Sequence, residues 1–238
     1  MITWTKTGKL GQSVTFQVTD RNGGYSSEPF NSLNIANWVG DDEQAVTKNL
    51  NAIRDASGTD FQIMNPEHGL DVQEVFGVEV TLKPADILVT MQPNVSLLVP
   101  SADCVSVIAA ACSKKFLLAA HVGWRGAAAG IGAKIMSTSQ LYGIQPADLE
   151  IFLGPAICGN CYEVQLDVQQ QVGKQLPKSV LNRDKFIGVD LRLGLQHYFA
   201  SVGAIVHNDQ PCTFESTNYY SFRKANITGR QGVLARLY

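Results

Sequence analysis

The middle of the chain carries the pattern that most constrains its fold. Between residues 72 and 121, short apolar runs rich in β-branched residues follow one another, separated by turn-forming residues, at 72–76, 86–90, 95–99, 105–111 and 116–121. Runs of this length that are bounded by Gly, Pro, Asn or Asp are typical of buried β-strands. We therefore expect a β-sheet core built from the middle of the chain.

Helical patterns lie on both sides of this region. Residues 43–56 place Val46, Leu50 and Ile53 at helical spacing behind Asp41 or Asp42, either of which could cap the helix. Further helices are expected at 127–141, 165–174 and 190–202, and further strands at 14–18, 151–153, 204–206 and 232–237. Because strands cluster and helices do not alternate strictly with them, the pattern favours an α+β fold with a mixed sheet. No linker divides the chain, so we expect one domain over residues 1–238.

The composition excludes several classes of protein. The chain of 238 residues is 45% hydrophobic, which suffices for a sizeable core. Its net charge of −2 and the lack of a basic tract argue against nucleic acid or anionic membranes as partners. The longest apolar stretch, residues 105–112, is too short to span a bilayer, and the N-terminal residues lack the apolar core of a signal peptide. Five irregularly spaced cysteines fit free thiols or metal ligands, so we expect a soluble cytoplasmic protein.

Residues that bind metals or transfer protons recur at the ends of the apolar runs. They lie in three segments, His68-Gly69, Asp103-Cys104 and His121-Val122-Gly123-Trp124-Arg125-Gly126. Two imidazoles and one thiolate would form a three-ligand site with one open position, which distinguishes a catalytic zinc from a structural one. Asp103 would either cap a strand end or orient a ligand histidine through a hydrogen bond.

The segment after residue 121 has the layout of an anion site. An apolar strand, a glycine turn and a helix start follow one another, an arrangement that points free backbone N–H groups at an anion. Arg125 could add a bidentate contact to phosphate or carboxylate. The alternative interpretation is a tight turn with an exposed arginine.

Two cysteines form a C-x-x-C motif, Cys158-Gly159-Asn160-Cys161, directly after Gly154-Pro155. A structural zinc needs a second pair of ligands, and only Cys112 and Cys212 remain outside the three segments above. A redox pair would instead begin a helix. The pattern therefore favours two loop thiols.

The sequence resembles a known family over nearly its whole length. The pair Ser101-Ala102-Asp103-Cys104 and 121–126 is similar to the A-D-C and H-x-G-W-R-G signature of the YfiH/laccase-domain family, also called the multicopper polyphenol oxidase family. Segments 154–157 and 220–223 match further motifs. The resemblance implies a mixed-sheet α+β sandwich flanked by helices and a cytosolic protein. It also implies that His68, Cys104 and His121 are metal ligands and catalytic residues, and that the Cys158/Cys161 loop is a family feature.

Family members have been described as purine nucleoside phosphorylases with adenosine deaminase activity. The resemblance therefore implies a zinc-dependent enzyme that takes a purine nucleoside and phosphate, with Arg125 and Gly126 as candidate phosphate contacts. One alternative is a copper-dependent polyphenol oxidase, although a multicopper site needs many more histidines than the four present. A second is a metal-free cysteine hydrolase, with Cys104 as nucleophile, His121 as base and a role in editing peptidoglycan precursors. A third is a degenerate binding module.

Two positions depart from the family pattern. The Gln-Val that precedes the first ligand histidine in the family is Pro66-Glu67 here, and Asn-Arg in the first helix is Asn49-Leu50. Neighbouring residues of an extended chain point to opposite faces, so we expect Glu67 to face away from the metal site. The alternative is that Pro66 bends the chain into a turn and the Glu67 carboxylate approaches the metal. Arg54, one helical turn after Leu50, is not expected to replace the missing arginine.

Overall fold

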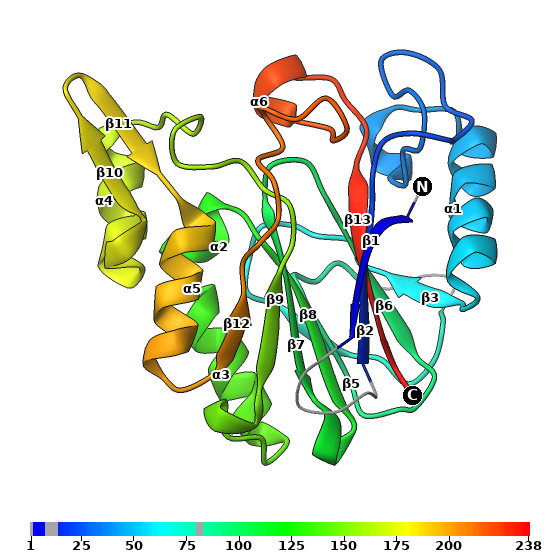
Figure 1. Cartoon of the computed structure of the whole chain (residues 1–238), viewed down its shortest axis with the longest axis horizontal. Coiled ribbons are helices and arrows are strands. Elements are labelled where there is room, and N and C mark those ends of the chain that lie inside the picture. The colour runs from blue at the N-terminus through cyan, green and yellow to red at the C-terminus, as the bar shows by residue number, and fades with distance from the viewer. Residues whose placement is uncertain (1, 8–13, 80–82) are drawn as a thin grey trace.

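Two β-sheets packed face to face form the centre of the structure, a computed structural model that describes residues 2–7, 14–79 and 83–238 (Figure 1). Within these residues, one sheet has five strands in the order β1-β2-β13-β6-β3, and the other has six in the order β12-β9-β7-β8-β5-β4. Both sheets are mixed, because the pairs β3–β6, β4–β5 and β9–β12 are parallel. The strands of the first sheet are β1 (Ile2–Thr7), β2 (Val14–Thr19), β3 (Phe61–Ile63), β6 (Ser96–Ser101) and β13 (Gln231–Leu237). Those of the second are β4 (Val72–Glu74), β5 (Ile87–Thr90), β7 (Val105–Ala111), β8 (Phe116–Val122), β9 (Glu150–Leu153) and β12 (Ile205–His207).

Alternating side chains of the strands serve two different apolar layers. In β8, Leu117 and Ala119 pack between the sheets against residues of β2, β6 and β13, whereas Leu118 and Ala120 pack against helices on the outer face. This period of two, with both faces apolar, is what a strand buried on both sides requires. It explains why the middle strands appear in the sequence as nearly continuous apolar runs.

Helices cover the outer faces of both sheets. The helix α1 (Glu43–Ser57) packs on the five-stranded sheet through Ile53, and its N-cap is Asp42, which accepts a hydrogen bond from the backbone of Gln44. The opposite outer face is covered by α2 (Trp124–Ala128), α3 (Ile131–Leu141) and α5 (Leu191–Ser201), with α4 (Leu166–Gln175) packed beyond them (Figure 1). The short α6 (Phe222–Ala225) precedes β13. The expected α+β fold, a mixed-sheet sandwich flanked by helices in a single domain, is confirmed.

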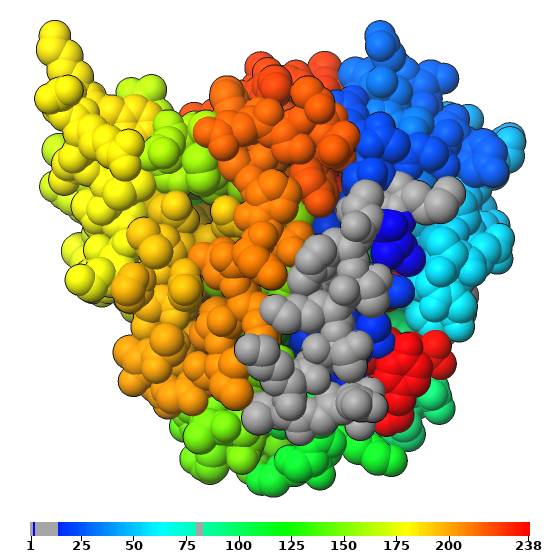
Figure 2. All heavy atoms as spheres, viewed as in Figure 1, coloured from blue at the N-terminus to red at the C-terminus, as the bar shows by residue number. Residues whose placement is uncertain are grey.

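The structure differs from the sequence-based expectation in two places. The helix expected over 127–141 is divided into α2 and α3 at Gly130, whose φ of 88° lies in the left-handed region that favours glycine. A hairpin of β10 (Val180–Arg183) and β11 (Phe186–Val189) was not expected. It projects from the body at the upper left of the view, and the space-filling picture shows it standing clear of the rest (Figures 1 and 2). Its strands, Val-Leu-Asn-Arg and Phe-Ile-Gly-Val, have only four residues each, too short for a clear strand pattern in the sequence.

None of the helices in the described ranges has the length and apolar composition that crossing a bilayer requires. The strand order also brings several chain segments to one end of the sandwich. Because β7 runs antiparallel to β8 and β8 antiparallel to β5, the start of β7, the end of β8 and the start of β5 lie at the same end. The end of β6 joins them, since only residues 102–104 separate it from β7.

Candidate metal centre

The three proposed metal ligands lie together at this end of the sandwich. Cys104 directly precedes β7, and His121 is the second-to-last residue of β8, where it pairs with Ser106. His68 comes from the connection between β3 and β4. The ligand atoms of His68, Cys104 and His121 all lie within 4.8 Å of one another. Local contraction around one ion would bring them to the distances of about 2.0–2.3 Å that zinc takes from nitrogen and sulfur.

His121 is held in the orientation of a metal ligand. Its side chain points between the two sheets, and its Nδ1 donates a hydrogen bond to the carbonyl of Pro100 in β6, at 3.0 Å. The tautomer is therefore fixed with a lone pair on Nε2, and this buried atom has no hydrogen-bond partner among the residues that the structure describes. Burial lowers the pKa of His121 to about 3, so the ring is neutral. A buried, neutral and unpartnered imidazole nitrogen is the donor that a transition metal binds, so the residues fit the metal that the family implies.

His68 is placed by a buried carboxylate. Asp86, directly before β5, accepts hydrogen bonds from the backbone N–H of His68 at 2.8 Å and of Gly69 at 2.7 Å. These bonds hold His68 in the left-handed region, with φ of 64°, and its ring meets that of His121 edge-on at a centroid distance of 5.0 Å. Burial lowers the pKa of His68, which favours the neutral, ligating form. Sequence reasoning did not identify Asp86 as a positioning residue. The available signals were an acidic residue at the start of an apolar strand and the similarity of Ala85-Asp86 to a family motif.

The Cys104 thiol lies beside His68 under a glycine. Burial raises the pKa of Cys104 to about 12, with the Asp103 carboxylate as the next contribution. A Cβ added at Gly123 would lie 2.8 Å from Cδ2 of His68 and 3.1 Å from the Cys104 sulfur. The first glycine of the H-x-G-W-R-G motif therefore makes room for the His68 ring and the Cys104 sulfur.

Among the described residues, the Asp103 carboxylate makes no hydrogen bond to the ring of His68 or His121. This carboxylate accepts from Thr213 Oγ1 at 2.6 Å, Ser221 Oγ at 3.0 Å and the backbone N–H of Arg223 at 2.6 Å. The hydrogen bond that orients His121 is accepted by the Pro100 carbonyl instead. Asp103 thus anchors the segment that follows β12, a role that the sequence did not indicate.

A cavity of about 450 Å³ opens onto the three ligands. Its walls include four aromatic side chains and three arginines: Trp38, Trp124, Tyr162, Phe222, Arg125, Arg223 and Arg230. The described part of the lining contains a single carboxylate, that of Asp103. Burial raises the pKa of the Tyr162 hydroxyl to about 12, so it remains protonated, and the Arg223 guanidinium lies 4.9 Å from the centre of its ring. Apolar walls with a few convergent polar groups are typical of a small-molecule site, and the arginine excess favours an anionic ligand.

The two residues of the turn expected to bind phosphate, Arg125 and Gly126, differ in their access to the cavity. Arg125 is exposed, lines the cavity and stacks 4.6 Å over the Trp124 ring. Gly126 is buried beneath it, and a Cβ there would lie 3.3 Å from the carbonyl oxygen of Gly69, so this glycine allows two turns to pack closely. The helix α2 that follows Gly123 has only five residues. Arg125 is therefore the stronger candidate for an anion contact.

The two departures from the family pattern lie at different distances from the cavity. Pro66 lines it, whereas Glu67 is exposed and outside its lining. Leu50 packs with the apolar cluster under α1. Arg54 donates to Asp60 at 2.7 Å and stacks over Phe61, so it is engaged away from the cavity.

Comparison with known proteins identifies the family of the chain. Residues 15–237 match the model of the family described as multi-copper polyphenol oxidoreductase laccase. A protein of Corynebacterium glutamicum named purine nucleoside phosphorylase is 32% identical over 226 residues, covering 90% of each chain. One of Mycobacterium tuberculosis with the same name is 34% identical over 230 residues, covering 94% of this chain and 92% of the relative.

Solved structures show the same architecture. The crystal structure of YlmD from Geobacillus stearothermophilus superimposes with a TM-score of 0.88 at 26% identity, covering 97% of this chain and 94% of that one. YfiH of Bacillus licheniformis gives a TM-score of 0.84 at 29% identity, covering 94% and 93%. With the fold, the motif pair and nearly the full length in agreement, the chain belongs to the multi-copper polyphenol oxidoreductase laccase family.

Proposed function

We propose that this protein is a zinc-dependent purine nucleoside phosphorylase that cleaves adenosine and inosine. Phosphate oxygen would bond to C1′ of the ribose while the bond from C1′ to the purine nitrogen breaks, giving ribose 1-phosphate and the free base. The observation that carries the proposal is the unpartnered Nε2 of His121, which meets His68 and Cys104 at the floor of a cavity walled by aromatic rings and arginines. The names of the curated relatives support the same substrate class.

His68, Cys104 and His121 would hold the ion. Bound zinc supplies positive charge and lowers the pKa of a coordinated water towards about 7. Around it, the aromatic walls, including Trp124 and Tyr162, can stack a purine, and Arg125 and Arg223 can bind phosphate. Adenosine deamination at C6, with water as the nucleophile, is the second activity we propose for this cavity.

The alternatives fit the geometry less well. A metal-free cysteine hydrolase needs a thiolate beside a protonatable histidine, but burial raises the pKa of Cys104 to about 12 and lowers that of His121 to about 3. A multicopper oxidase needs histidines beyond this site, yet of the two others His207 bonds Glu150 at 2.5 Å and His197 lies on α5.

The test combines turnover with metal content. Purified protein is assayed for free base and ribose 1-phosphate from adenosine and inosine with phosphate, and for inosine from adenosine without phosphate. We expect Cys104→Ala to remove both the bound zinc and the activity while the protein stays folded, and Cys112→Ala, a cysteine outside the site, to retain both. Activity that survives complete chelation yet disappears in Cys104→Ala would instead support the cysteine hydrolase. No turnover of any nucleoside by the zinc-loaded protein would support a binding module.

A further inference from the structure

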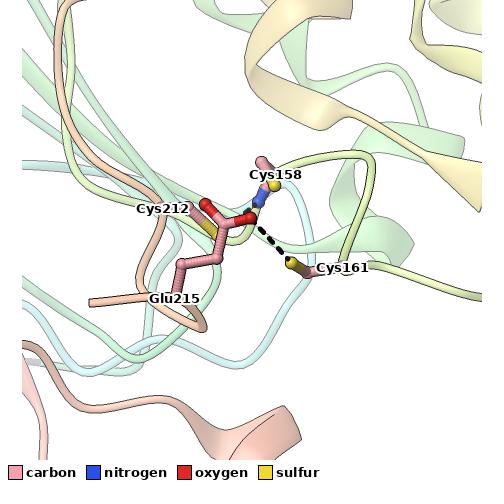
Figure 3. A group of neighbouring side chains, drawn as sticks. All are labelled: Cys158, Cys161, Cys212 and Glu215. Carbon is pink, nitrogen blue, oxygen red and sulfur yellow. Dashed lines mark hydrogen bonds between the residues drawn. The ribbon is translucent and has the colours of Figure 1, made fainter. Parts of the chain in front are cut away.

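A second group of potential metal ligands lies outside the cavity. Cys158, Cys161, Cys212 and Glu215 each offer one ligand atom, and these atoms all lie within 4.8 Å of one another. Figure 3 shows the three sulfurs and the carboxylate gathered from two chain segments, with the Cys161 thiol 3.6 Å from Glu215 Oε1. In a tetrahedral zinc site with Zn–S distances of about 2.3 Å, neighbouring ligand atoms lie about 3.5–3.8 Å apart. The distance of 3.6 Å between Cys161 Sγ and Glu215 Oε1 falls in this range, and no two of the four ligand atoms are more than 4.8 Å apart.

The backbone builds this arrangement from two turns that are paired with each other. The first turn is closed by the N–H groups of Cys161 and Tyr162, which both donate to the Cys158 carbonyl at 3.0 Å, so that both sulfurs of the C-x-x-C motif face one side. The second is closed by Ser216 N–H, which donates to the Cys212 carbonyl at 3.1 Å. The segments meet in a β-bridge between Ala156 and Cys212.

Two further features suit thiolates at this position. The backbone N–H of Cys158 donates to the Cys212 sulfur at 3.2 Å, a contact that stabilises negative charge on sulfur. The guanidinium of Arg192, at the start of α5, donates to the carbonyls of Gln210 and Pro211 and lies close enough to Cys158 and Cys212 for electrostatic attraction. A fixed positive charge beside the cluster offsets part of the excess negative charge of three thiolates and a carboxylate around a divalent ion.

We propose that Cys158, Cys161, Cys212 and Glu215 bind a second zinc ion in a closed structural site. Three soft thiolates favour zinc over harder divalent ions, and four protein ligands leave no open position for a substrate. The site differs in this respect from the three-ligand centre in the cavity. The proposal goes beyond the proposed function and does not depend on it.

The cluster lies between two chain segments that form one wall of the cavity. Ile157 and Tyr162, on either side of the C-x-x-C turn, line the cavity, and Ile157 N–H donates to the Asp103 carbonyl at 3.1 Å. On the other segment, Thr213 follows Cys212 and bonds the Asp103 carboxylate. An ion here would fasten together the two segments that form one wall of the cavity.

Zinc stoichiometry of the full chain, purified with zinc under reducing conditions and measured by elemental analysis, tests the proposal. We expect two zinc ions per wild-type chain, one in Cys161→Ser and two in Cys112→Ser, the matched control for loss of a cysteine outside both clusters. Chelation should lower the thermal unfolding midpoint of the wild type more than that of Cys161→Ser, since an ion that binds only the folded state stabilises it. Equal zinc content in Cys161→Ser and wild type would overturn the proposal.

A second measurement covers the case in which Cys161→Ser does not fold. Cobalt is bound to the Cys104→Ser protein, which keeps all four proposed ligands but has lost one ligand of the cavity site. We expect one cobalt ion with strong thiolate-to-metal charge-transfer absorption, several times that of a single-thiolate site. Absence of bound cobalt, or a Cys158–Cys161 disulfide found by mass spectrometry in protein kept under reducing conditions, would contradict the proposal. Nucleoside turnover is not part of either readout, so failure here is distinct from failure of the proposed function.

Discussion

Gly123 shows how closely single residues are fitted around the proposed zinc. Its missing Cβ leaves the space that the His68 ring and the Cys104 sulfur occupy, at 2.8 and 3.1 Å from where that carbon would be. Asp86 fixes the backbone of this histidine through hydrogen bonds, so the ring could clear the space only by rotating about its side-chain torsions. A methyl group at this position must therefore displace a ligand.

We predict that Gly123→Ala weakens zinc binding tenfold or more, about 1.4 kcal/mol, while the protein remains folded. The affinity is measured by competition with a chromogenic chelator and the fold by circular dichroism. Gly77→Ala is the matched control, because a Cβ at Gly77 meets nothing within 4 Å. Unchanged zinc affinity in Gly123→Ala would mean that the ligands are held loosely enough to adjust.

At this scale the sequence revealed the proposed ligands but not what orients them. His68, Cys104 and His121 stand in recognisable glycine-marked motifs, and the resemblance assigned them directly. Asp86 acts across 17 and 18 residues of chain, through the backbone N–H groups of Gly69 and His68, and Pro100 acts across 21 residues through its carbonyl. Such contacts depend on which strands become neighbours, so no local pattern encodes them.

Among the elements, the segment between β12 and β13 closes the cavity end of the sandwich. It has little regular structure, and its residues Phe222, Arg223 and Arg230 contribute to the cavity walls. Three of the hydrogen bonds that attach it to the rest of the fold are accepted by Asp103. One carboxylate therefore couples the residue next to Cys104 to the whole C-terminal wall.

We predict that Asp103→Asn lowers the free energy of unfolding by about 1–3 kcal/mol, because an amide removes one acceptor oxygen from a buried network. Amide hydrogen exchange should accelerate over residues 213–223 more than in the strands. Asp60→Asn, which alters an exposed pair with Arg54, serves as the control and should leave exchange in that segment unchanged. Uniform acceleration throughout the chain would indicate general destabilisation and contradict an anchoring role.

The elements that sequence reasoning found are those with strong local signals. The buried strands β7 and β8 were recognised from apolar runs, and α1 from its helical spacing behind Asp41 or Asp42, of which Asp42 is the cap. The helix expected at 190–202 is α5, which Asp190 caps. The break at Gly130 was missed because glycine among small residues also suits a continuous helix. The grouping of Cys212 with the C-x-x-C turn was missed because 54 residues separate Cys158 from Cys212 and only the fold brings them together.

Across the whole molecule, Tyr220 joins chain segments that are far apart in sequence. Its buried hydroxyl donates to the carbonyl of Phe30 at 2.6 Å, and Arg21 stacks 4.8 Å over its ring. Burial raises the pKa of Tyr220 well above its usual value near 10. Above that pH the unfolded chain releases the proton while the folded chain keeps it, so the contribution of Tyr220 to stability is full below pH 10 and declines as pH rises.

We predict that Tyr220→Phe is less stable than the wild type by about 0.5–1.5 kcal/mol at pH 8, through loss of this hydrogen bond. The difference should shrink between pH 9.5 and 11, because phenylalanine does not ionise in either state. Urea unfolding of both proteins across this range measures it. Tyr25→Phe, at an exposed tyrosine, should follow the wild type at every pH. A difference that is constant with pH would show that Tyr220 ionises as readily in the fold as outside it.

The position of β13 has a consequence for how the protein is made. This strand lies between β2 and β6 in the five-stranded sheet, yet it is synthesised after every other described strand. Until β13 has left the ribosome, β2 and β6 present unpaired edges, and the apolar layer between the sheets lacks Val233, Ala235 and Leu237. The emerging chain must therefore remain open, with exposed edges that attract chaperones or other nascent chains, and the sandwich closes only after translation of its last strand.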